Sequence, residues 1–187
     1  MYRFTLYIYR LYKKGQTIME VIEAMMQRRS IRKYTDEKVT DEEINTLMHC
    51  AMSGPSAVNK CPWEFYVIRN EEVLQQLRKA TRFTNIVSPC AIVVCGNMSR
   101  ALPMQLKDFW IQDCSAATEN ILLSATALNL GTVWCGIYPQ KNAVKKVSSI
   151  LNLPEKHIPL NIIFVGHPDQ SPEARDQYEQ KRVHMID

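Results

Sequence analysis

DFWIQDCSAATENILLSATAL, residues 108–128, is rich in alanine, leucine and serine and contains neither glycine nor proline. This composition predicts one long helix, because good helix formers dominate it and the two residues that interrupt helices are absent. Asn129 and Gly131 follow, which predicts that the helix ends there. Its small side chains would let another helix pack closely against it: Ser115, Ala116, Ala117, Ser124, Ala125 and Ala127.

Shorter helices and strands are predicted on both sides of this long helix. Thr40 and Glu43 have the spacing of a capping box, as do Thr17 and Glu20, so each pair predicts the start of a helix. The remaining patterns predict helices at 70–79 and 142–151, and strands at 63–68, 91–95, 132–138 and 161–165. This order predicts an α+β fold with helices packed around a modest sheet.

The length of 187 residues fits one domain with a substantial core, and 46% apolar with 22% charged residues are ordinary globular values. The net charge of +4 lies entirely in residues 1–18, and the rest of the chain is balanced. A nucleic-acid-binding face across the domain therefore has no support. We expect residues 1–18 to be an N-terminal extension ahead of a domain spanning 19–187. A role of this extension at a membrane surface or with an acidic partner is the less favoured alternative.

The six cysteines form no C-x-x-C pair, and the four histidines are scattered along the chain. A zinc site is therefore not predicted. No run approaches the roughly 18 apolar residues that a membrane-spanning helix needs, and the first residues make a poor secretion signal. We expect a cytoplasmic protein with reduced thiols, no metal site and no membrane partner.

The chain has only six glycines and neither of the common glycine-rich motifs that cradle phosphates. An anionic ligand would therefore depend on cationic side chains. Arg28, Arg29, Ser30 and Arg32 are the main candidates, because they follow a predicted helix directly and arginine's fork of donors matches a phosphate. Taken alone, these arginines also suit a helix C-terminus, where positive charge stabilises the dipole.

Two further stretches are unusual. GPSAVNKCPW, residues 54–63, predicts a stiff loop in which Asn59 offers a donor and an acceptor, as the edge of a heteroaromatic ring requires. LGTVWCGIYP, residues 130–139, places Gly136 inside a predicted strand, which suggests that another group approaches the backbone closely. Taken alone, the first also fits an ordinary helix-to-strand connection with Trp63 in the core, and the second a bulge or simple packing.

RRSIRKY, GPSAVNKCPWEF and LGTVWCGIYP, in this order around the long helix, resemble the FMN-dependent nitroreductase family and especially its short bacterial members. The resemblance covers about Met19 to His184. It implies an α+β, nitroreductase-like fold with a central, mostly antiparallel sheet flanked by helices and a C-terminal tail. It also implies an intertwined homodimer, with the long helix in its core and two FMN molecules at the interface.

The resemblance implies roles for the basic residues. Arg28, Ser30 and Arg32 would hold the FMN phosphate and ribityl chain, with Arg29 nearby. Arg175, in the tail, matches a second phosphate-contacting position. Family members frequently carry a basic residue two positions before Arg175, whereas this chain has Glu173. The phosphate would then depend more heavily on Arg28 and Arg32.

Two other segments would border the isoalloxazine ring of FMN. The backbone of Cys135 and Gly136 would approach its N5 side. Family members often have glutamine where this chain has Cys61, which puts one polar contact in doubt. The residues expected to border the ring from the partner subunit are Pro55, Ser56, Ala57 and Asn59.

The activity implied is that of an FMN-dependent oxidoreductase. It would take hydride from NADH or NADPH and reduce a planar electrophile, such as a nitroaromatic, a quinone or a conjugated carbonyl, by a ping-pong mechanism. No side chain is predicted to be catalytic, because the cofactor carries the chemistry. Two alternatives stay open: a non-catalytic flavin-binding or sensor protein, and an enzyme of the same fold with another reaction, such as dehalogenation or flavin fragmentation.

Overall fold

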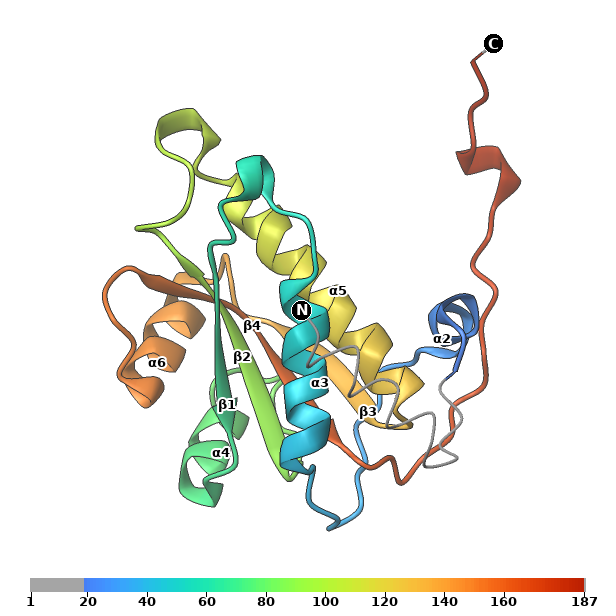
Figure 1. Cartoon of the computed structure of the whole chain (residues 1–187). Coiled ribbons are helices and arrows are strands. Elements are labelled where there is room, and N and C mark those ends of the chain that lie inside the picture. Colours follow the sequence, from blue (N-terminus) through green and yellow to red (C-terminus); the bar gives the residue numbers. More distant parts are fainter. Residues whose placement is uncertain (1–18, 187) are drawn as a thin grey trace.

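A computed structural model describes residues 19–186 of the chain. The predicted extension at residues 1–18 and its capping residue Thr17 lie outside the described residues. Within them, one open sheet has the strand order β1-β2-β4-β3, and every neighbouring pair is antiparallel (Figure 1). The predicted α+β fold with an antiparallel sheet is confirmed. The strands are β1 (Trp63–Ile68), β2 (Cys90–Asn97), β3 (Gly131–Gly136) and β4 (His157–Gly166).

Helices cover both faces of the sheet (Figure 1). On one face, α3 (Asp41–Met52) and α5 (Phe109–Ala127) pack on one set of alternating strand side chains. On the other face, α4 (Glu71–Arg78) and α6 (Lys141–Leu151) cover the alternate set. The central strands β2 and β4 are therefore apolar on both sides, as the AIVVC and IIFV runs require. Another helix, α2 (Val21–Gln27), lies against α5.

Local sequence sets most of the element boundaries. The capping box of α3 is confirmed: Glu43 N donates to Thr40 Oγ1 at 3.2 Å, and Thr40 N donates to Glu43 Oε2 at 2.7 Å. The prediction for β4 was too short, because the strand continues through Pro159. A register shift opposite this proline, between Val94 and Cys95 on β2, accommodates the missing N–H.

The segment from Ser30 to Thr35 runs beside the end of the sheet. Ser30 forms an isolated parallel bridge with Thr132 of β3, and Ile31 N donates to the Thr132 carbonyl at 2.8 Å. At the other end, Thr35 N donates to the His167 carbonyl at 2.9 Å. The arginine motif is therefore fixed by main-chain hydrogen bonds to β3 and to the chain that follows β4.

Most apolar side chains of α2 are left uncovered. Val21, Ile22, Met25 and Met26 are 53–73% exposed, and Ala24 alone in this helix is buried. We call these four side chains the α2 face. A contiguous exposed apolar patch of this kind is typical of an interaction surface. None of the helices within residues 19–186 has the length and apolar character that crossing a bilayer demands.

Candidate functional site

The predicted phosphate-binding residues lie around one cavity of about 630 Å³. The cavity is enclosed between the segment after α2 and the C-terminal tail, which are far apart in sequence. Its size is in the range of small-molecule sites. The lining includes the five residues predicted to lie at the phosphate: Arg28, Arg29, Ser30, Arg32 and Arg175. We call it the arginine cavity.

The arginines of this cavity differ in how far their donors are already used. Arg28 has a single contact with a carboxylate, at 3.9 Å from Glu119 on α5, and Arg32 has a long 3.5 Å bond to the Ser30 carbonyl. Arg29 instead donates from all three guanidinium nitrogens to main-chain carbonyls. Arg28 and Arg32 therefore keep donors that could bind an anion.

Arg32 links the arginine cavity to the end of β3. Its positive charge acts on Cys135, where burial raises the pKa of the thiol to about 11 and Arg32 counteracts part of this increase. The Cys135 Sγ lies 3.3 Å from the Phe83 carbonyl, so the loop after α4 also approaches this point. Burial raises the pKa of Tyr34 as well; its hydroxyl donates to the Ile31 carbonyl at 2.5 Å and keeps the motif against the sheet.

Gly136 faces open space. A Cβ built on it would meet nothing within 4 Å, whereas a Cβ on Gly131, in the same strand, would come within 2.6 Å of Ile31. The register of β3 and β4 is continuous up to Gly136, and directly after it Ile137 N and Tyr138 N both donate to the Leu160 carbonyl, a pattern typical of a bulge. Nothing in the described chain packs against this glycine, so there is room for another group beside it, and a bulge directly after Gly136 remains the alternative to a close approach.

The loop of Pro55, Ser56, Ala57 and Asn59 lies apart from the arginine cavity and supplies none of its lining. Ala57 N donates to Asp113 Oδ1 on α5 at 2.8 Å, and Cys61 N donates to Ser56 Oγ at 2.9 Å. These bonds hold an unusual backbone, in which Val58, Asn59 and Cys61 all have positive φ. These contacts fix the loop against α5, and the loop does not line the arginine cavity of its own chain.

Several site residues were not predicted from the sequence. Asp113 is buried and accepts the hydrogen bond that anchors the loop of Pro55 to Asn59. Gln170 Oε1 accepts a 3.4 Å hydrogen bond from the main-chain N of Arg32. Asp113 is one of two acidic residues in α5, with Glu119, and the sequence of the helix carries no signal that separates the buried one from the other. Glu173 also lines the arginine cavity, so this chain has an acidic side chain beside the arginines where family members frequently carry a basic one. Within residues 19–186, no cluster of three or more His, Cys, Asp or Glu side chains could hold a metal ion.

These residues fit FMN. The arginine cavity offers charge-assisted donors for a phosphate, and Gly136 leaves an open approach to the backbone of β3. Arg32 connects the arginine cavity with the end of β3, because it lines the cavity and its charge also counteracts part of the increase that burial causes in the pKa of Cys135, the residue before Gly136.

Comparisons with known proteins agree with this fold. The Nitroreductase family matches residues 25–90 and 86–167. A protein of Methanothermobacter thermautotrophicus, provisionally named an NADH dehydrogenase/NAD(P)H nitroreductase, is 41% identical over 169 residues, which cover 89% of this chain and 87% of the relative.

Two solved structures extend the likeness to three dimensions. A Parabacteroides distasonis protein with the same provisional name has a TM-score of 0.83 and 34% identity, with 88% of this chain and 96% of that one covered. A provisionally named nitroreductase of Desulfovibrio desulfuricans, crystallised in complex with FMN, has a TM-score of 0.76 and 30% identity, with 90% and 98% covered. With its fold, its motifs and these similarities in agreement, the chain belongs to the nitroreductase family.

Proposed function

We propose that this protein is an FMN-dependent oxidoreductase that takes hydride from NADH or NADPH and reduces a planar electrophile. The observation that carries the proposal is the arginine cavity, in which Arg28, Arg32 and Arg175 surround a space suited to one phosphate. The names of the similar proteins support the cofactor and the hydride donor, since one was crystallised with FMN and another is provisionally named for NAD(P)H.

In this proposal Arg28, Ser30, Arg32 and Arg175 hold the phosphate, and FMN supplies the acceptance and donation of hydride when bound. The backbone beside Gly136 lies open for the reacting edge of the ring. Backbone N–H groups there would stabilise negative charge. The hydride donor and the electrophile would use this place in turn, which is a ping-pong scheme.

We also propose a homodimer with the flavin site at its interface. The loop of Pro55 to Asn59 does not line the arginine cavity of its own chain, and in this proposal the partner subunit supplies it to the flavin ring. The α2 face supports such an interface, since its apolar side chains have no cover within the described residues. An adjoining apolar cavity of about 350 Å³ reaches α5, through Leu123 and Ala127.

The function is tested with purified full-length protein. We expect a flavin absorbance spectrum, FMN released on denaturation, and oxidation of NADH or NADPH that depends on menadione or a nitroaromatic. A protein that neither carries nor takes up FMN would contradict the proposal. Bound FMN without turnover would favour the sensor alternative, and turnover only with a halogenated aromatic would favour the dehalogenase alternative.

The phosphate site has its own test. Arg28→Ala and Arg32→Ala should each weaken FMN binding by about tenfold or more, the loss expected for one charge-assisted hydrogen bond. Binding of riboflavin, which lacks the phosphate, should not change. Arg100→Ala, at an exposed turn outside the cavity, is the matched control. Equal losses for FMN and riboflavin would return Arg28 and Arg32 to a purely structural role.

Light scattering tests the dimer. The full chain should have twice the mass of one subunit, and Ile22→Glu or Met26→Glu on the α2 face should convert it to monomers with weakened FMN binding. Val87→Glu, at an exposed apolar position on the loop before β2, is the control. A monomer that binds FMN tightly would contradict the interface.

A further inference from the structure

Arg29 uses its guanidinium group to hold the C-terminal tail. Its Nε donates to the Glu173 carbonyl at 2.9 Å and its Nη2 donates to the Arg175 carbonyl at 3.2 Å. These two nitrogens form one edge of the planar group, so a single side chain spans two carbonyls that are two residues apart. The third nitrogen, Nη1, donates to the Arg28 carbonyl at 2.5 Å.

Few other contacts hold this part of the chain. Asp169 N donates to the Lys33 carbonyl at 3.0 Å, and the Gln170 side chain accepts from Arg32 N. Beyond Gln170, the hydrogen bonds and ion pairs within the described residues are local to the tail, apart from the two that Arg29 makes. The position of Arg175 therefore depends on Arg29.

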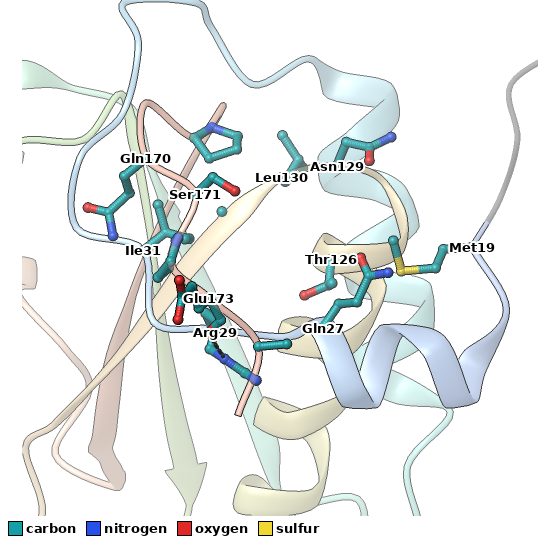
Figure 2. A pocket seen from close by; sticks show the side chains of 14 residues that line it. Met19, Gln27, Arg29, Ile31, Thr126, Asn129, Leu130, Gln170, Ser171 and Glu173 are labelled. Carbon is teal, nitrogen blue, oxygen red and sulfur yellow. Dashed lines mark hydrogen bonds between the residues drawn. The ribbon is translucent and has the colours of Figure 1, made fainter. Parts of the chain in front are cut away.

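The tail that Arg29 holds is also a wall between two cavities. Arg29, Gln170 and Glu173 line both the arginine cavity and a second cavity of about 550 Å³ between α2, the end of α5 and the tail. Figure 2 shows this second cavity, with Arg29 beside Glu173 and with Gln170 and Ser171 on the same stretch of tail. Without the bonds from Arg29, the tail would move away from its place between the two cavities. Arg175 would then move out of the arginine cavity together with the tail.

We propose that Arg29 is a positioning residue that keeps Arg175 at the phosphate site, and that it does not itself bind the phosphate. The inference rests on the proposed function, in which Arg175 contacts the FMN phosphate. It assigns different roles to adjacent arginines: Arg28 and Arg32 keep donors for the anion, whereas the donors of Arg29 are directed to carbonyls. Arg29 therefore acts on the anion only through Arg175.

A double-mutant cycle separates positioning from direct contact. We expect Arg29→Ala and Arg175→Ala each to weaken FMN binding by about tenfold to a hundredfold, the range for one charge-assisted hydrogen bond. The double variant should be no weaker than either single variant, because both remove the same contact. Riboflavin affinity should stay unchanged throughout. Losses that multiply in the double variant would show that Arg29 binds the phosphate itself and would overturn the proposal.

Arg29→Lys adds a second criterion. Lysine keeps the positive charge but cannot span two carbonyls, so this variant should bind FMN as weakly as Arg29→Ala. Recovery of most of the FMN affinity by lysine would mean that charge alone matters, and would overturn the positioning role. Circular dichroism of each variant checks that the fold is intact.

The tail itself provides a readout that does not depend on the phosphate. Chymotrypsin should cut at the exposed Tyr178 several-fold faster in Arg29→Ala and Arg29→Lys than in the original protein or in Arg100→Ala. Unchanged cleavage would refute the tail anchor. If cleavage is faster in the Arg29 variants but Arg175→Ala binds FMN as tightly as the original protein, Arg175 does not contact the phosphate. That result would overturn the proposed link between the tail anchor and the phosphate. Absence of FMN binding in the original protein would instead refute the proposed function.

Discussion

Asn161 on β4 donates a hydrogen bond from Nδ2 to the hydroxyl of Thr118 on α5, at 2.9 Å, and both side chains are fully buried. The Thr118 hydroxyl in turn donates to the Cys114 carbonyl at 2.8 Å. Asn161 is also the residue that pairs with Gly136 across the sheet. This buried link therefore ties the long helix to the part of the sheet where the flavin ring is proposed to lie.

Thr118→Val should destabilise the protein by about 1–3 kcal/mol, because it leaves the buried Asn161 amide without its acceptor. The double variant Asn161→Leu/Thr118→Val removes both polar groups and should recover part of this loss. Urea unfolding at a fixed FMN concentration measures the difference. A double variant that loses the sum of the single effects would show that the two side chains do not interact.

Gly136→Ala and Gly131→Ala should affect different properties, although both glycines lie in β3: the first should weaken FMN binding and the second should lower stability. The new methyl group at Gly131 would strike Ile31, so this variant should lose about 1–3 kcal/mol of folding free energy. At Gly136 the methyl group meets open space, so the fold should keep its stability while FMN binding weakens by about tenfold, the effect of one overpacked methyl group. Thermal unfolding and FMN titration separate the two. Full FMN affinity in Gly136→Ala would place the ring elsewhere.

Glu173→Gln should strengthen FMN binding by about twofold to fivefold, since it removes a negative charge from the wall of the arginine cavity at an exposed position. The bond from Arg29 goes to the main-chain carbonyl of Glu173, so the tail keeps its anchor. The gain should shrink as salt is added. Glu72→Gln, on α4, serves as the control, and a gain of equal size there would point to net charge alone.

Stability should fall in alkaline solution because of buried thiols. Burial raises the pKa of Cys90 to about 11, of Cys114 to about 12 and of Cys135 to about 11, from an ordinary value of 9.0. In the unfolded chain these thiols lose their protons at lower pH than in the fold. Their contribution is therefore complete below about pH 9 and is lost as pH rises towards 11 and 12.

Urea unfolding in reductant between pH 7 and 11 measures this effect. Each thiol should add up to about 1.4 kcal/mol per pH unit to the fall in the free energy of unfolding. Cys114→Ala should reduce the slope of this free energy against pH by up to the same amount. Comparison of slopes excludes the constant cost of the cavity that the substitution leaves. A slope that Cys114→Ala does not change would contradict the assignment.

Local signals were sufficient for much of the fold. Thr40 and Glu43 predicted the start of α3, and the aromatic and β-branched run WEFYVI predicted β1 with its observed ends. The extent of β4 was missed because Pro159 usually interrupts a strand, and the register shift on β2 that accommodates it cannot be seen in the proline's own neighbourhood. The start of α2 was also missed: the helix begins at Val21, with Glu20 at its N-cap.

The site was predictable only where its residues are close in sequence. Arg28, Ser30 and Arg32 were expected to converge after a helix, and they line one cavity. The different role of Arg29 depends on carbonyls at Glu173 and Arg175, more than 140 residues away, which no local pattern specifies. Asp113 is a similar case, because its partner Ala57 belongs to another element.

The main-chain contact between Ser30 and Thr132 has a consequence for the behaviour of the chain in solution. β3 is the last strand of an open sheet, and such a strand can recruit strands from other molecules. Ser30 and Ile31 occupy part of this edge, so the arginine motif also shields the sheet from intermolecular pairing. Damage that detaches the motif should therefore promote aggregation as well as loss of the ligand, and a bound phosphate that holds the motif in place should protect against both.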